Sequence, residues 1–410
     1  MGPTPIPTPS ADQIVATKVS QFGRKRRDWV QSIARRTKKE IPPEVEKFFD
    51  AIEAGRWDEI DAIWKDMAKR SGQYEGSTHS PELDPFWCAI LETYGAAEAA
   101  HDWPAQKLLD YGETILGSLR PGMVYVGGTD AGRFIPTLLN ETGDTEPHIV
   151  LTQNALADGR YLEYVRSMYG DKFAAPTDED SQRAFQEYTA DAQKRLEHDQ
   201  QFPDEPSQIQ PNEKVEMVDG KVQVSGQIAV MAINEKILQT ILQKNPDASF
   251  ALQESFPFKG TYADAVPLGP IMELRAPEAA TTFTAERASQ VLGSLRDTAQ
   301  QLLSDPESLS SPEALKTYSH DLTSQANLLS AHNFTGEAEQ AFRLSSQLWP
   351  GNPEPVVLLS NLLSQNGRSS EAQQLIDDFV AKNPDQRTVM ESLRGKATST
   401  PLVSQDSKPD

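Results

Sequence analysis

The sequence has very little cysteine and no long apolar segment. Its one cysteine, Cys88, excludes an internal disulfide bond but does not decide the compartment. Cys88 lies in PFWCAILETY, where we expect a buried helix thiol rather than a nucleophile. No run approaches the about 20 apolar residues that a membrane-spanning helix needs. The start, MGPTPIPTPSADQ, lacks an apolar signal-peptide core, so we expect a flexible leader over 1–13 and a disordered tail over 396–410.

Motifs for the common cofactor and metal chemistries are also absent. The six histidines are scattered and none forms an H-E-x-x-H pair. There is no G-x-S-x-G nucleophile elbow and no G-x-x-x-x-G-K-[ST] phosphate loop. We therefore predict no metal site and no cofactor.

The charge of the chain is strongly negative, but one segment is basic. A net charge of -21 disfavours a nucleic-acid partner. Between Lys18 and Lys39 there are nine Lys/Arg and one Asp, with apolar residues at helical spacing. This pattern predicts a basic amphipathic helix. It would make peripheral contact with a membrane or an acidic partner, or else pack on its acidic neighbours, which is the interpretation that we favour.

Apolar spacing predicts helices over most of residues 14–120. Two prolines, Pro42 and Pro43, stand where a first helical turn accepts them, and a helical hairpin follows to residue 70. The segment 85–119 repeats this pattern. The first third of the chain is therefore expected to be a basic helix followed by helical hairpins.

Residues 121–277 have the pattern of an α/β domain. The short β-rich runs MVYVGG (Met123–Gly128) and HIVLTQ (His148–Gln153) each precede a helical segment, which favours a Rossmann-like core with a parallel or mixed sheet. A polar helix is expected over 178–199. Asp219-Gly220 predicts a two-residue hairpin, and Asn245-Pro246 ends the next helix. SFALQESF and IMELR are candidate further strands.

Residues 284–385 contain an internal repeat. NLLSAHNFTGEAEQAF starts at Asn327, and NLLSQNGRSSEAQQLI starts 34 residues later, at Asn361. This period, with small residues in the second helix, is typical of tetratricopeptide repeats and predicts a TPR-like α-solenoid. Two units fall short of a stable stack, so we expect the array to lean on the α/β domain or on a partner.

Four segments carry a resemblance to a known family: VYVGGTDAGRFIPTLLNE, VLTQNALADGRYLEYVRSMYG, VQVSGQIAVMAIN and ESFPF. They resemble the soluble C-terminal part of bacterial membrane proteins that look like C-superfamily glycosyltransferases. Those proteins are akin to the transmembrane protein O-mannosyltransferase with a tetratricopeptide tail. The resemblance spans about Arg27 to Arg275 plus the repeats. It implies a soluble module on the envelope side of a membrane, without the membrane portion that transfers the sugar; a cytoplasmic address is the alternative.

The loop GGTDAGR after the first predicted strand allows three interpretations. Its glycines follow G-G-x-x-x-G rather than G-x-G-x-x-G, and Asp130 is unfavourable to a phosphate. A sharp turn with Thr129 or Asp130 as N-cap explains the residues without a ligand. The third interpretation is a polar crevice, because ligands of open α/β sheets bind beyond the carboxyl ends of the strands.

The crevice hypothesis groups the polar residues that follow three predicted strands. Amides, carboxylates and an aromatic ring suit a hydroxyl-rich ligand such as a glycan or a glycosylated peptide. Asp130 and Glu254 are weak candidates for an acid–base pair. The candidate ligand-binding residues are Gly127, Gly128, Thr129, Asp130, Arg133, Gln153, Asn154, Asp158, Tyr161, Glu254 and Ser255.

The function that these patterns favour is a non-catalytic binding or scaffold module. The repeats would hold a protein partner, with Asn327, Asn361 and Gln365 as candidate contacts, within envelope glycan or protein-glycosylation machinery. Two alternatives stay open. One is a carbohydrate-active enzyme that uses the crevice, and the other is an adaptor attached to a membrane by Lys18–Lys39.

Overall fold

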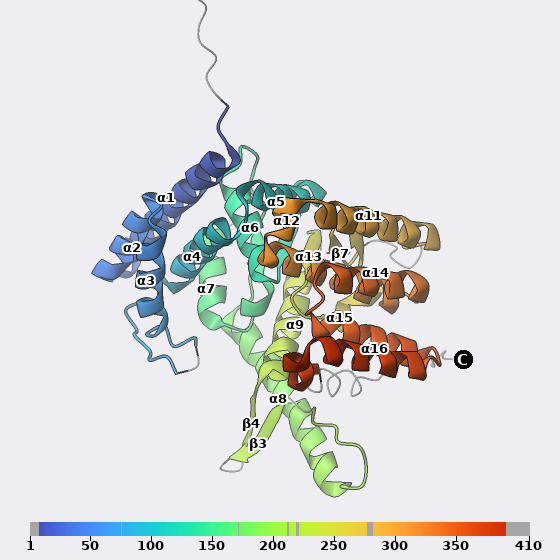
Figure 1. The fold of residues 1–410 in the computed structure, drawn as a ribbon. Coiled ribbons are helices and arrows are strands. Elements are labelled where there is room, and N and C mark those ends of the chain that lie inside the picture. Colours follow the sequence, from blue (N-terminus) through green and yellow to red (C-terminus); the bar gives the residue numbers. More distant parts are fainter. Residues whose placement is uncertain are drawn as a thin grey trace, which may run out of the picture.

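The computed structural model describes residues 8–390, except for 75, 171, 211–212, 219–220 and 277–281. Five helices open the chain: α1 (Ala11–Thr37), α2 (Pro43–Glu53), α3 (Trp57–Ala68), α4 (Trp87–Asp102) and α5 (Ala105–Ser118). Figure 1 shows α1, α2 and α3 on one flank of the molecule and the last helices on the opposite flank. The predicted helical region 14–120 is confirmed.

Helix α1 begins earlier than predicted. Ser10 caps it by accepting a hydrogen bond from the backbone N–H of Gln13, and the Gln13 side chain bonds back to Ser10. The predicted leader 1–13 is therefore wrong for its last residues; residues 1–7, like the predicted tail 396–410, lie outside the described part.

The basic residues of α1 are largely engaged by the protein itself. Lys18 donates to the carbonyl oxygen of Thr142, and Lys25 to that of Glu141. Both oxygens lie at the C-terminal end of α6 (Asp130–Glu141). Cations are favoured there by the helix dipole. Arg27 pairs with Asp50 at 2.6 Å and with Glu53 at 3.2 Å on α2. Packing on acidic neighbours, the interpretation favoured above, agrees with these contacts.

The central sheet is mixed, with five strands in the order β2-β1-β5-β7-β6. Strands β1 (Val124–Gly127), β2 (Val150–Thr152) and β5 (Phe250–Gln253) are parallel, whereas β7 (Ile271–Leu274) and β6 (Val266–Leu268) are antiparallel to their neighbours. All residues of β1, β2, β5 and β7 are buried, as expected for a sheet that is covered on both faces. The predicted α/β core is confirmed, and β6 was missed.

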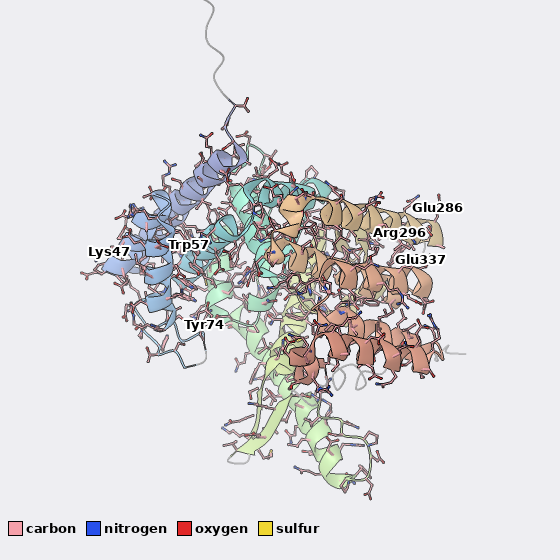
Figure 2. All side chains as sticks on the ribbon, viewed as in Figure 1. Lys47, Trp57, Tyr74, Glu286, Arg296 and Glu337 are labelled. Carbon is pink, nitrogen blue, oxygen red and sulfur yellow. The ribbon has the colours of Figure 1, made fainter. Side chains whose placement is uncertain are left out.

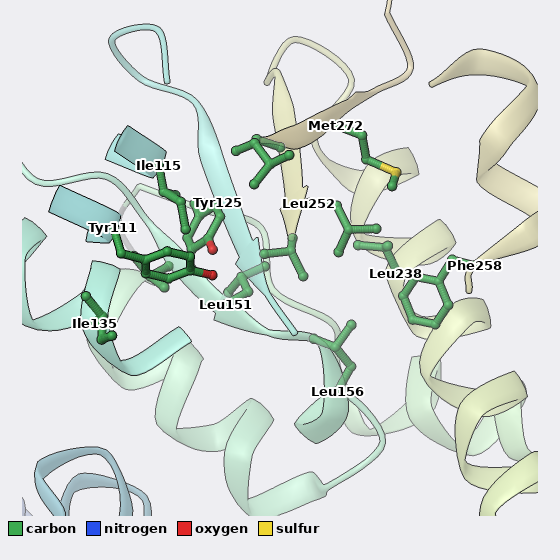
Figure 3. Packing of buried hydrophobic residues seen from close by; sticks show 14 of the residues in the cluster. Tyr111, Ile115, Tyr125, Ile135, Leu151, Leu156, Leu238, Leu252, Phe258 and Met272 are labelled. Atoms are coloured by element: carbon green, nitrogen blue, oxygen red, sulfur yellow. The ribbon is translucent and has the colours of Figure 1, made fainter. Parts of the chain in front are cut away.

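Helices cover both faces of the sheet. In Figure 3, Tyr111 and Ile115 of α5 and Ile135 of α6 (Asp130–Glu141) lie on one side of β1 and β2. Leu238 of α9 (Gln227–Lys244) and Phe258 lie on the other side of β5. A short η1 (Gln153–Ala155) and α7 (Gly159–Tyr169) follow β2, and η2 (Lys259–Asp264) precedes β6.

An arm projects from this body. Helix α8 (Asp178–Gln201) and the hairpin of β3 (Lys214–Val218) with β4 (Lys221–Ser225) extend below the sheet in Figure 1. The polar helix, the antiparallel pairing of Val218 with Lys221 and the end of α9 at Asn245 are as predicted. The predicted turn residues Asp219 and Gly220 lie outside the described residues. The arm is anchored where Lys244 bonds to Asp180.

The C-terminal part is a layer of stacked helices. It consists of α11 (Ala285–Ser304), α12 (Pro306–Leu309), α13 (Pro312–Ala331), α14 (Thr335–Leu348), α15 (Pro353–Gln365), α16 (Ser369–Lys382) and η3 (Pro384–Gln386). Helices α14 and α16 start 34 residues apart. Arg296 of α11 and Glu337 of α14 face one another in Figure 2; Arg296 bonds to Gln340, and Ser289 donates to Glu337 at 3.3 Å.

The array and the sheet share one hydrophobic core. A single cluster of buried side chains runs from Val15 of α1 through β1 to Leu363 of α15. Helix α13 packs against β6, β7 and η2. The array thus leans on the α/β domain through α13, as the small number of repeats led us to expect.

Candidate functional site

The carboxyl ends of β1, β2 and β5 lie side by side, since these three strands are parallel neighbours. The loops predicted to meet there do meet. The Gln153 Oε1 atom accepts a hydrogen bond from the Ser255 backbone N–H at 2.7 Å, and Asn154 Nδ2 donates to Ser255 Oγ at 3.4 Å. These polar groups therefore bind each other across the edge of the sheet.

The glycine loop after β1 is a tight turn. A Cβ atom on Gly128 would lie 2.3 Å from the Ser255 backbone nitrogen and 2.5 Å from the Gln253 carbonyl oxygen. Thr129 is the N-cap of α6 and accepts from the Gly132 N–H at 2.9 Å. Gly128 is thus required by the close approach of β5, which is the interpretation that needs no ligand.

We expect Gly128→Ala to lower the free energy of unfolding by about 1–3 kcal/mol, because backbone atoms of β5 must move to admit the methyl group. Urea denaturation followed by tryptophan fluorescence measures this. Gly117→Ala is the matched control. Nothing lies within 4 Å of its Cβ position on α5, so it should stabilise by up to about 1 kcal/mol. Equal stability of the two variants would contradict the close-packed turn.

Gln253, which the sequence analysis did not select, links the glycine loop after β1 to α13 at this edge of the sheet. Its Oε1 atom accepts from the backbone N–H groups of Gly128 at 3.1 Å and Thr129 at 3.0 Å. Its Nε2 atom donates to Asp321 of α13 at 2.6 Å, and the Tyr111 hydroxyl donates to the other oxygen of Asp321 at 3.1 Å. The donors that a phosphate would use at the start of α6 are taken by Gln253.

Glu254 is buried beneath α13 with 2% of its surface exposed. The Tyr262 hydroxyl lies 2.8 Å from both carboxylate oxygens. Burial raises the pKa of Glu254 to about 7, and burial likewise raises the pKa of Asp321 to about 6.

His320 joins α13 to the sheet edge. Its Nε2 atom donates to the Glu254 carbonyl oxygen at 2.7 Å, and its Nδ1 atom lies 3.2 Å from Glu354 of α15. Burial alone would lower the pKa of His320, but the hydrogen bond and charge of Glu354 outweigh it and raise that pKa to about 9. His320 is therefore a cation at neutral pH, held between a carbonyl group and a carboxylate.

The other candidates lie apart from this network. Arg133 pairs with Asp130 at 2.9 Å, and the Asp130 side chain is 75% exposed. Asp158 caps α7 and accepts from Gln73 at 3.0 Å. The Tyr161 hydroxyl accepts from the Thr152 backbone N–H at 2.6 Å and so completes the end of β2. Asp130 and Glu254 are not joined by any contact among the described residues.

A pocket of about 460 Å³ opens beside the same edge, between α4, the start of α6 and α13. Two predicted residues, Thr129 and Asp130, line it; the others were not selected, because no local pattern brings α4 and α13 to the start of α6. The lining residues are Gly95, Glu98, Ala99, Asp102, Trp103, Thr129, Asp130, Ala131, Phe134, Glu313, Lys316, Thr317 and His320.

Glu98 is a carboxylate of this pocket that forms no ion pair with a described residue. It accepts a hydrogen bond from the Tyr94 hydroxyl at 2.9 Å. Its pKa is raised, chiefly by burial and then by the negative charges of Asp102, Asp130 and Asp61. By contrast, Asp130 pairs with Arg133 and Glu313 with Lys316. The pocket therefore holds excess negative charge beside the apolar side chains of Trp103 and Phe134.

The residues proposed to hold a protein partner lie on α13 and α15. Asn327 and Asn361 are half-buried and Gln365 is exposed. None of them hydrogen-bonds through its side chain to another described residue.

In the described ranges there is no group of three or more His, Cys, Asp or Glu arranged for a metal ion, and no helix long and apolar enough to cross a membrane. Cys88 is buried on α4, and burial raises its pKa.

Comparison with known proteins adds no relative: the chain matches no family model, no curated protein and no solved structure.

Proposed function

We propose that this chain is a non-catalytic binding module for a protein partner, and that the pocket between α4, α6 and α13 receives a positively charged segment of that partner. The helical array, interpreted as TPR-like, extends the contact surface. The observation that carries the proposal is Glu98, a half-buried carboxylate of the pocket wall that pairs with no cation among the described residues and whose pKa is raised by burial and by other carboxylates.

A non-catalytic role is supported by the way in which the sheet edge is used. The groups that an enzyme would direct at a substrate, Gln253, Glu254 and Asp321, are buried and bonded to other protein groups. A general acid must reach the atom that it protonates, and Glu254 is almost inaccessible. The carbohydrate-active alternative therefore has less support. Docking of α1 to a membrane also has less support, because Arg26, Arg27 and Lys25 bind other groups of the protein.

A basic side chain matches the pocket in both its apolar and its polar parts. The long stem of Lys or Arg packs on apolar surface while its charged end meets a carboxylate. Phe134 already accepts a guanidinium in this way: the Arg133 Cζ atom lies 4.1 Å from the centre of its ring. A cation beside Glu98 would also relieve the repulsion among Glu98, Asp102 and Asp130.

The C-terminal helical array would provide a second part of the proposed contact surface for the protein partner. The side-chain amides of Asn361 and Gln365 on α15 pair with no described residue, and they can donate to and accept from a peptide backbone. The resemblance noted in the sequence suggests that the partner belongs to envelope glycan or protein-glycosylation machinery.

We expect a labelled oligolysine peptide to bind the full chain more tightly than oligoglutamate, with an affinity that falls as salt is added. Fluorescence anisotropy measures both. Glu98→Gln should weaken oligolysine binding about fivefold, which corresponds to about 1 kcal/mol.

The control for this experiment is Glu113→Gln on α5, which removes one exposed carboxylate outside the pocket lining. It should leave the affinity unchanged. If Glu113→Gln and Glu98→Gln weaken binding equally, the peptide senses only net charge and the proposed site is wrong. Binding of both peptides with equal affinity would contradict a basic partner.

A further inference from the structure

The hairpin on the projecting arm is a sheet of two strands, and neither edge pairs with another described strand. Strands β3 and β4 bond to each other, and no backbone group of residues 214–218 or 221–225 hydrogen-bonds to a described residue outside the hairpin. An isolated two-stranded ribbon is marginal in water, and open strand edges are templates for another strand. Figure 1 shows the ribbon standing away from the central sheet.

The hairpin register decides which backbone groups face outward. Val218 pairs with Lys221 next to a connection of two residues, which is the hydrogen-bonded position of a tight hairpin. Hydrogen-bonded and non-hydrogen-bonded pairs then alternate. The N–H and C=O groups of Val222 and Val224 therefore point out from β4, and those of Val215 and Met217 point out from β3.

The same four residues form the apolar face of the ribbon. Val215 lies opposite Val224, and Met217 opposite Val222, so all four side chains share one side. Val215 and Val224 pack against the body, whereas Met217 is 54% exposed. The apolar face is thus only partly covered, and it would continue across a strand added at either edge.

The charges of the two strands distinguish the two edges. If β4 pairs with its own copy about a two-fold axis, the full-length register places Gln223 opposite Gln223 and Val222 opposite Val224. The outward backbone groups then meet one another, and no like charges oppose. For β3 the same register places Glu216 opposite Glu216, which is unfavourable.

One shifted register of the β3 edge is also unfavourable. Moving the two-fold axis to Val215 would bring Glu213 into the pairing. Glu213 is 6% exposed and is held by the Tyr188 hydroxyl at 2.5 Å and by Arg195 at 2.6 Å. The start of β3 is therefore held by the arm through Glu213, whereas β4 carries no carboxylate. Helices α8 and α9 lie beside β4, but no outward backbone group of Val222 or Val224 hydrogen-bonds to a described residue.

We infer that two copies of this chain associate through the outer edge of β4, forming an antiparallel four-stranded sheet in the order β3-β4-β4-β3. We take the partner strand to be β4 of a second copy, because β4 is complementary to itself. In this register Lys221 faces Ser225 of the second copy, Val222 faces Val224, and the two Gln223 side chains face each other. The contact is small, so the dimer is weak and depends on concentration.

Sedimentation velocity of the full chain over a wide concentration range tests this inference. The wild type should shift from monomer to dimer as concentration rises. Val224→Pro removes an outward N–H from each copy and should weaken dimerisation about tenfold or more. Hydrogen exchange should show the N–H groups of Val222 and Val224 protected in the dimer.

The matched control is Val215→Pro, the cross-strand partner of Val224 in the same hairpin. It removes the equivalent N–H from the β3 edge and should leave dimerisation unchanged, while circular dichroism shows whether both variants are folded. Gln223→Glu, which places two carboxylates on the two-fold axis, should abolish the dimer, whereas Glu216→Gln should retain it. A wild type that is monomeric throughout, or equal behaviour of the two proline variants, would overturn the inference.

Discussion

Replacing Arg26 with methionine is expected to lower the free energy of unfolding by about 3–5 kcal/mol, the usual effect of removing one partner from a buried ion pair. Arg26 lies on α1 with 2% of its side chain exposed. Its Nη atoms donate to both oxygens of Glu141 on α6, and its Nε atom donates to Glu92 on α4 at 3.0 Å.

The effect is large because two carboxylates depend on this guanidinium. Glu92 and Glu141 are only 16% and 13% exposed. Methionine fills much of the same volume, so the loss reports the charge rather than a cavity. Burial already raises the pKa of Glu92, and without Arg26 the hydrogen bond that Glu92 keeps among the described residues is that from the Tyr164 hydroxyl at 2.5 Å.

Urea denaturation compares this variant with Arg24→Met, an exposed arginine on the same helix that should change stability by less than about 0.5 kcal/mol. Adding Glu92→Gln and Glu141→Gln to Arg26→Met should restore part of the loss, since uncharged amides need no counter-ion. A loss from Arg26→Met as small as that from Arg24→Met would mean that the three helices are held by apolar packing alone.

Much of the fold could be predicted from local pattern. Alternation around Asp219-Gly220 gave the hairpin register, and the helical period ended correctly at Asn245. These signals are local, because capping and turn chemistry act within a few residues. The strand β6 was missed because its three residues include Pro267 and lie at the sheet edge, where a short strand has little pattern.

The candidate site could be predicted only in part. Parallel strands bring their carboxyl ends together, so the approach of Gln153 to Ser255 followed from strand order. The partners on α13 did not, since Asp321 meets Gln253 from 68 residues away. One feature of the sequence could have indicated that α13 packs on the sheet edge. Ser319, Asp321, Thr323 and Gln325 are too polar for an ordinary repeat core, and all four are buried because they bind the sheet edge and α14.

The buried titratable groups beneath α13 make the stability of the protein depend on pH. The pKa of Glu254, about 7, lies above that of an unfolded glutamate, so the folded state binds this proton more tightly. Its contribution is complete below about pH 4 and disappears as the pH rises to 7. At about 1.4 kcal/mol per pKa unit, the loss is about 3 kcal/mol. Asp321, with a pKa of about 6, acts in the same direction.

His320 extends the loss to higher pH. Its pKa of about 9 lies above the ordinary value, so its stabilising charge is complete below about pH 6.5 and is lost towards pH 9. We therefore expect the free energy of unfolding, measured in urea, to fall continuously from pH 5 to pH 9. Glu254→Gln should reduce the decline between pH 5 and 7, leaving the part due to Asp321, and should keep the decline above 7. His320→Gln should remove the decline above 7. A stability that rises between pH 5 and 9 would show that the contact between α13 and the sheet edge does not hold these protons, and that the array is joined to the sheet by its apolar residues.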